Sequence, residues 1–90
     1  MTVYMVERNL PGITLEQLAA AQKAAIAKGE EFTAAGKAVR YLRSIFVPGE
    51  ARCMCLFEAS SPDAVKELNE AAQIPFTEIK EALDLPPQVA

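Results

Sequence analysis

The chain has 90 residues, of which 51% are hydrophobic and 23% charged, a size and composition that predict one folded domain over residues 1–90 and exclude a disordered chain. Nine basic and twelve acidic residues give a net charge of −3, which argues against a nucleic-acid partner, because such proteins gather Lys and Arg on one surface. No stretch approaches the ~20 apolar residues that span a bilayer and no signal-peptide pattern opens the chain, so no membrane partner is predicted and the expected location is cytoplasmic.

The first quarter of the chain predicts a strand and then a long helix. Residues 2–8 alternate Val3, Met5 and Glu7 with a second set of Tyr4, Val6 and Arg8, which is the period of a strand. The segment 14–17, Thr-Leu-Glu-Gln, fits a capping box at a helix start. An alanine-rich body follows, and a glycine at position 36 is the expected end of the helix.

The middle of the chain predicts a β-hairpin. Residues 38–47 and 52–59 form two strand-like runs, and the Pro-Gly-Glu-Ala segment between them is a turn signal. With this loop, Phe46 is expected opposite Cys53, and Tyr41 opposite Glu58. The hairpin side chains then divide between two faces. One face, apolar enough to lie under helices, carries Leu42, Ser44, Phe46, Cys53, Cys55 and Phe57, and the other carries Tyr41, Arg43, Ile45, Met54, Leu56 and Glu58.

A second helix and a last strand complete the predicted fold. The segment 60–63, Ser-Ser-Pro-Asp, supplies a cap, a first-turn proline and an acidic residue at the start of a helix that is expected to run to about residue 73. Residues 76–83 are assigned to a fourth strand, and the proline-rich end is expected to be a surface tail. The resulting order, βαββαβ, predicts an α+β ferredoxin-like domain with a four-stranded antiparallel sheet and both helices on one face.

The sheet face opposite the helices is the expected functional surface, and two interpretations of it remain open. It could be a homodimer interface, in which Arg43 pairs with Glu7 or Glu58. Alternatively, two such faces could enclose a small-molecule pocket, with Arg43 binding an anion, Tyr41 forming a polar aromatic wall and Glu7 or Glu58 accepting a proton. The candidate ligand-binding residues are Glu7, Tyr41, Arg43, Met54 and Glu58.

The two cysteines are the only soft-ligand cluster in the sequence. Because Cys53 and Cys55 alternate within one strand, they share a face and are poorly placed to bridge each other. They are either small buried hydrophobic side chains or ligands of a thiophilic metal whose shell other groups would complete. The chain has no histidine, which excludes a Ser-His or Cys-His nucleophile within it.

Three stretches, VERNLPGIT, VRYLRSIFVPGEARCMCLFEASSPDAVKELNEAAQIPF and TEI, together carry a resemblance that covers nearly the whole chain. They resemble a family of small bacterial ferredoxin-like domains of unassigned function that includes a homodimeric nickel-binding protein. The resemblance implies this fold and a homodimer, associated as a dimeric α/β barrel. Nickel-associated members carry histidines at places that hold Arg43, Leu68 and Asn69 here, so any bound metal would rest on Cys53, Cys55 or a carboxylate.

The sequence therefore predicts a small dimeric cytoplasmic domain that binds a small molecule at the open sheet face without a cofactor. The first alternative is a metal-binding protein that holds nickel or another thiophilic divalent metal. The second is a cofactor-independent isomerase or monooxygenase, by analogy with enzymes of this architecture that work at the open sheet face. Whether the protein is an enzyme stays open.

Overall fold

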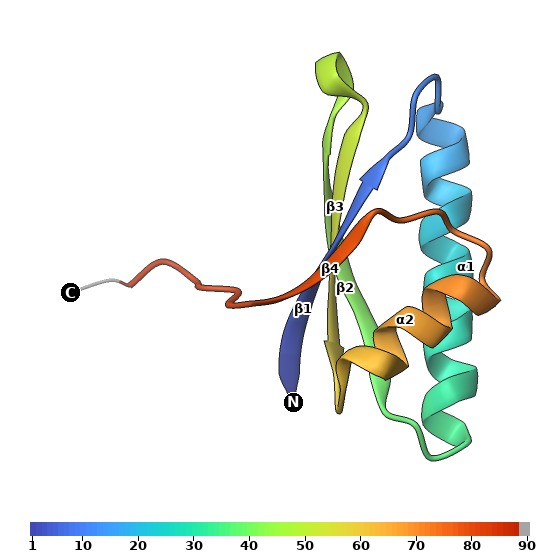
Figure 1. Cartoon of the computed structure of the whole chain (residues 1–90), viewed down its shortest axis with the longest axis vertical. Coiled ribbons are helices and arrows are strands. Elements are labelled where there is room, and N and C mark those ends of the chain that lie inside the picture. The colour runs from blue at the N-terminus through green and yellow to red at the C-terminus, as the bar shows by residue number, and fades with distance from the viewer. Residues whose placement is uncertain (89–90) are drawn as a thin grey trace.

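The predicted α+β architecture is confirmed by the computed structural model, which describes residues 1–88. The four strands form one antiparallel sheet in the order β2-β3-β1-β4, and both helices cover the same face of it (Figure 1). This is the ferredoxin-like βαββαβ fold. The elements are β1 (Thr2–Asn9), α1 (Leu15–Ala34), β2 (Val39–Val47), the 3-10 turn η1 (Pro48–Glu50), β3 (Arg52–Ala59), α2 (Pro62–Ala71) and β4 (Glu78–Ala82).

The core lies between the sheet and the two helices. Strand β1 turns Tyr4, Val6 and Arg8 toward the helices, because alternate side chains of a strand point to opposite faces. Phe57 of the neighbouring strand and Leu68 of α2 fill the centre of this layer and are both fully buried. The alternation read from the sequence of β1 is therefore confirmed, and it brings a charged side chain into the core.

Helix α1 begins with the predicted capping box. The backbone N–H of Gln17 donates to Thr14 Oγ1 at 3.0 Å, and the backbone N–H of Thr14 donates to Gln17 Oε1 at 2.9 Å. The helix ends at Ala34, and Gly36 follows with a left-handed φ of 93°, as glycine does at many helix ends. In the second half of α1, Gly29 lies against the backbone of β2, where an added Cβ would come within 3.1 Å of the carbonyl oxygen of Val39.

The β2–β3 hairpin follows the predicted register on one side of Leu42 and departs from it on the other. Phe46 pairs with Cys53 as expected, and the pairing continues to Arg43 opposite Leu56. At Leu42 strand β2 contains a β-bulge, so Tyr41 pairs with Phe57. The expected pairing of Tyr41 with Glu58 is wrong, since Arg40 takes that place.

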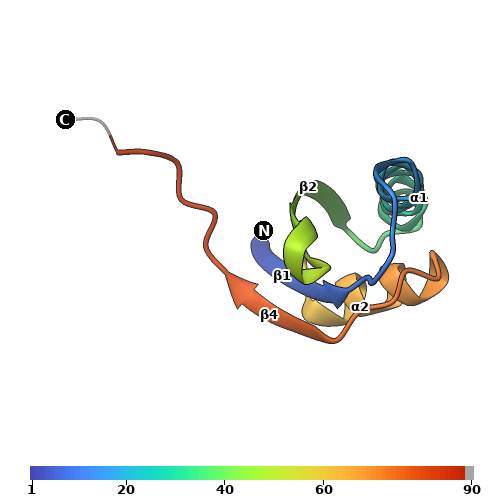
Figure 2. The same cartoon turned by 90° about the horizontal axis from the view of Figure 1, so that it is seen from above.

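The last third of the chain adds α2, β4 and an arm. Ser61 Oγ accepts a hydrogen bond from the backbone N–H of Ala64 at 3.2 Å, which confirms the predicted cap of α2. Strand β4 is shorter than the expected range 76–83. Beyond it, the chain extends away from the helices with Leu83 and Leu85 largely exposed (Figure 2). Within residues 1–88, neither helix combines the length and the apolar character that a membrane crossing needs.

Candidate functional site

The sheet face opposite the helices carries an apolar cluster, here called the open face cluster, which consists of Met5, Ile45, Met54 and Leu56. These side chains come from β1, β2 and β3 and are neighbours across the sheet, because Met5 pairs with Leu56 and Met54 pairs with Ile45. Ile45 is 58% exposed, and no helix covers this face (Figure 1). The structure thus leaves a compact apolar surface in contact with solvent.

Ion pairs surround the open face cluster. Glu7 is only 21% exposed and lies 3.4 Å from Arg52 and 3.8 Å from Lys80. Arg40 pairs with Glu58 at 2.8 Å. Within the chain, Arg43 pairs with Asp84 at the root of the C-terminal arm, and its pairing with Glu7 or Glu58 in a dimer interface stays a prediction. Four of the five predicted ligand-binding residues, Glu7, Arg43, Met54 and Glu58, therefore share this face.

Tyr41, the fifth predicted residue, lies on the helix side of the sheet, so its predicted placement on the open face is wrong. Its ring contacts Phe57 edge to face, with 5.5 Å between ring centroids. Its hydroxyl is hydrogen-bonded to Ser44 Oγ at 2.6 Å and accepts a hydrogen bond from Gln22 Nε2 at 2.8 Å. The bulge at Leu42 is the cause, because one extra residue reverses the facing of every residue before it.

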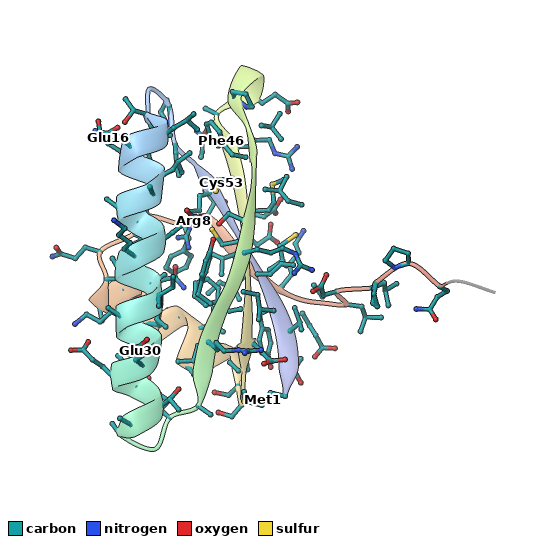
Figure 3. All side chains as sticks on the ribbon, turned by 180° about the vertical axis from the view of Figure 1, so that it is seen from behind. Met1, Arg8, Glu16, Glu30, Phe46 and Cys53 are labelled. Atoms are coloured by element: carbon teal, nitrogen blue, oxygen red, sulfur yellow. The ribbon has the colours of Figure 1, made fainter. Side chains whose placement is uncertain are left out.

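A second polar cluster lies inside the molecule, between the sheet and the helices, and is centred on Arg8. This side chain is only 4% exposed, and Figure 3 shows it with Cys53 in the layer between α1 and the sheet. Its guanidinium donates to Asn69 Oδ1 at 2.6 Å, to the carbonyl oxygens of Ile74 and Pro75 at 3.4 and 3.1 Å, and to Cys55 Sγ at 3.3 Å. None of these partners is a carboxylate.

The two cysteines belong to the same interior cluster. Their sulfur atoms lie 3.8 Å apart, and Cys55 Sγ is also hydrogen-bonded to Ser44 Oγ at 3.0 Å. Cys53 is 1% exposed and Cys55 6%. Burial and, to a smaller extent, the adjacent Cys55 raise the pKa of Cys53 to about 11, and the nearby Arg8 charge opposes part of this rise. A cavity of about 20 Å³ borders both cysteines, Arg8, Tyr41 and Ser44.

Reasoning from the sequence missed Arg8 as part of any site. One signal could have found it, because Arg8 shares its strand face with Tyr4 and Val6 and so had to enter the core with them. Its partners could not have been found in this way. Cys55, Asn69 and Pro75 lie 47 to 67 residues further along the chain.

A larger hollow lies outside both clusters, along the sheet edge where α1 passes β2. It has a volume of about 700 Å³ and is lined chiefly by apolar and small residues, among them Ile26, Gly29 and Ala38. Arg40 and Glu30 are the charged residues of its lining. Neither this hollow nor the interior cavity is lined by a residue of the open face cluster.

Comparison with known proteins agrees with this architecture. Residues 4–81 match the model of a family described as nickel responsive protein SCO4226-like. The chain belongs to the SCO4226-like family. Its fold is also similar to the crystal structure of SCO4226 from Streptomyces coelicolor A3(2), with a TM-score of 0.76, 28% sequence identity, and coverage of 98% of this chain and 99% of that chain. No curated protein matches significantly.

In the part of the chain that the structure describes, this member of the SCO4226-like family does not gather a conventional metal-ligand set. Among residues 1–88, no group of three or more His, Cys, Asp or Glu side chains is placed to hold a metal ion. The two cysteines come together without a third such ligand, and the half-buried Glu7 has two cations beside it. The metal-ligand pair predicted from the sequence, Cys53 and Cys55, is brought together but lies inside the molecule.

Proposed function

We propose that the protein is a homodimeric binding domain whose two open sheet faces pack together and enclose a site for a small organic molecule. The observation that carries this proposal is the uncovered apolar cluster of Met5, Ile45, Met54 and Leu56. Apolar clusters of this kind are uncommon on monomers and mark interaction surfaces. Packing this cluster against the same cluster of a second copy removes both from water, since a twofold interface is self-complementary.

The charged residues that surround the open face cluster support the binding of a polar ligand between the two faces. Arg43 is 57% exposed even with Asp84 beside it, so part of its guanidinium is free to bind an anionic group. Glu7 lies on the same face, three strands of the sheet contribute to the surface, and Met54 supplies an apolar wall. Tyr41 lies on the other face and has no part in this proposal.

The dimer is tested by the mass of the protein in solution. We expect the wild type at tens of micromolar to sediment at about twice the chain mass of 9.7 kDa, and Leu56→Glu to sediment at 9.7 kDa. The matched control is Leu15→Glu, which changes a 78%-exposed leucine at the start of α1 and should leave the dimer intact. A monomeric wild type, or a folded Leu56→Glu that remains dimeric, would contradict the proposal.

Ligand binding is tested separately by the thermal shift that acetate, benzoate and salicylate produce. A ligand that binds only the folded state raises the midpoint of unfolding. We expect a concentration-dependent rise with at least one of these anions, and its loss in Arg43→Ala. Lys23→Ala, which changes an exposed cation on α1, is the control and should respond as the wild type does.

A metal-binding role is the second candidate, because the family is described as nickel responsive. The residues of a single chain do not fit nickel. The chain has no histidine, the described residues offer no group of three suitable donors, and the cysteine pair has the cationic Arg8 beside it. The cysteines suit a different kind of ion.

The third possibility, a cofactor-independent enzyme, has no observation in its favour. Glu7 and Glu58 lie on the open face, whereas Tyr41 lies between the sheet and α1. These three side chains do not form one catalytic set.

A further inference from the structure

The interior cluster around Cys53 and Cys55 has an unusual balance of charge. Arg8 carries a guanidinium cation, yet it is 4% exposed and every hydrogen-bond acceptor found for it is formally neutral. Buried charges in proteins are normally paired with an opposite charge, because an isolated ion in a low-dielectric interior is costly. The atom that faces its Nε is the sulfur of Cys55, at 3.3 Å.

The geometry of the sulfurs suits a bridging ion. Cys53 and Cys55 project from β3 to the same face, and their sulfur atoms are 3.8 Å apart. The cavity of about 20 Å³ beside them, which is about the size that one small atom or water requires, allows the sulfurs to separate slightly. No disulfide joins them.

We propose that Cys53 and Cys55 form a two-coordinate site for a soft monovalent metal ion of the Cu(I) class, with Arg8 as its counter-charge. Binding replaces the two S–H bonds with two S–metal bonds and releases two protons, with no electron transferred. Two thiolates and one Cu(I) ion carry a total charge of −1. The buried guanidinium carries +1, so the occupied cluster is neutral.

The same charge count disfavours divalent ions. A divalent metal on two thiolates is neutral, so the buried Arg8 would remain uncompensated beside it. Zinc also requires four ligands, and the described residues offer no third Cys, His, Asp or Glu within reach of this pair. Thiolate ligands are those that soft ions such as Cu(I) select. This inference is independent of the dimer and of the small-molecule site, since neither cysteine lies on the open face.

The site is tested by anaerobic titration of the protein with Cu(I) in competition with the chromophoric chelator bicinchoninate. We expect one Cu(I) per chain, and at least 100-fold weaker binding in Cys53→Ser and in Cys55→Ser. Ser44→Ala is the matched control, because it removes a hydrogen-bond partner of Cys55 and no ligand, so its stoichiometry should stay at one. Cu(I) uptake by Cys53→Ser/Cys55→Ser equal to that of the wild type would overturn the proposal.

Two further measurements on the wild-type protein remain decisive if a cysteine variant fails to fold. X-ray absorption of the Cu(I)-loaded protein should show two sulfur neighbours and no nitrogen or oxygen neighbour. Equilibrium dialysis against Zn²⁺ and Ni²⁺ should show binding at least 100-fold weaker than that of Cu(I). A wild type that fails to compete for Cu(I), or that retains either divalent ion as tightly, would refute the assignment.

The role of Arg8 as counter-charge has its own readout. Arg8→Gln removes the positive charge and keeps hydrogen-bond donors, so Cu(I) affinity should fall at least tenfold while the preference for Cu(I) over Zn²⁺ narrows. If Arg8 were purely structural, its replacement would weaken the binding of both ions equally. An unchanged ratio in folded Arg8→Gln would therefore remove the charge argument.

Discussion

Removing the guanidinium of Arg8 is expected to destabilise the protein strongly. In Arg8→Met the fully buried Asn69 Oδ1 loses its donor at 2.6 Å, and Cys55 Sγ and the carbonyl oxygens of Ile74 and Pro75 lose theirs. A buried acceptor left without a donor costs about 1–3 kcal/mol, whereas the carbonyl of the exposed Pro75 can be hydrated at smaller cost. We expect the free energy of unfolding to fall by about 3 kcal/mol.

A loss of this size is easy to detect in a small domain. A chain of this length has a total stability of roughly 5–13 kcal/mol, and 3 kcal/mol corresponds to a drop of about 12–24 °C in Tm. Urea unfolding followed by far-UV circular dichroism is the suitable assay, since the chain has no tryptophan. The control is Arg52→Met on strand β3, where a 51%-exposed arginine makes only surface ion pairs and its loss should change stability by less than about 0.5 kcal/mol.

A double-mutant cycle separates the buried hydrogen bonds from loss of packing. Asn69→Leu removes the acceptor that Arg8→Met leaves without a donor, and it nearly preserves side-chain volume. The double variant Arg8→Met/Asn69→Leu should therefore be at least about 1 kcal/mol more stable than the sum of the two single effects predicts. Strictly additive effects, or a folded Arg8→Met within about 0.5 kcal/mol of the wild type, would refute this account of the interior cluster.

Three further predictions concern local features. Gly29→Ala should lower stability by about 1–2 kcal/mol in urea unfolding, because its Cβ would meet the Val39 carbonyl oxygen at 3.1 Å. This cost should outweigh the roughly 1 kcal/mol that alanine gains over glycine in a helix. A stabilised variant would show that strand β2 shifts away from the helix at little energetic cost. Thr14→Ala should cost about 1 kcal/mol by removing the cap of α1, with Thr2→Ala, in the exposed first residue of β1, as the unaffected comparison. The folded-state pKa of Cys53 is raised to about 11 from the usual 9.0, so the stabilisation that this protonated thiol provides is fully present below pH 9. The free energy of unfolding should fall by at most roughly 2 kcal/mol between pH 9 and 11. Cys53→Ala should lack this part of the decline.

Local signals in the sequence predicted the elements and most of the register. The capping box at Thr14, the serine cap of α2 and the Pro-Gly turn each act within a few residues, so they can be read from the chain directly. The turn fixed the pairing of Phe46 with Cys53, and the β-strand period carried that register as far as Arg43. Four of the proposed ligand-binding residues therefore fell on the expected face.

The bulge at Leu42 and the surroundings of Arg8 could not be predicted in the same way. The bulge contains neither glycine nor proline, and it allows the ring of Tyr41 to pack against Phe57 of the adjacent strand. The only sign of the bulge in the sequence is that the inward-facing residues change from odd positions, Val39 and Tyr41, to even ones, Ser44 and Phe46. The acceptors of Arg8 come from β3, α2 and the segment after α2, so they exist as a set only in the folded chain.

The bulged strand has a further consequence for how the protein behaves at high concentration. Strands β2 and β4 form the two margins of the sheet, and unpaired backbone groups at such margins can recruit strands from other molecules and start fibrils. Along β2 the irregularity at Leu42 interrupts that backbone template, and Arg40 and Arg43 flank it with like charge. Strand β4 has only five residues, of which Glu78, Lys80 and Glu81 are charged. Self-association through the open faces should therefore stop at closed pairs instead of growing into open-ended aggregates.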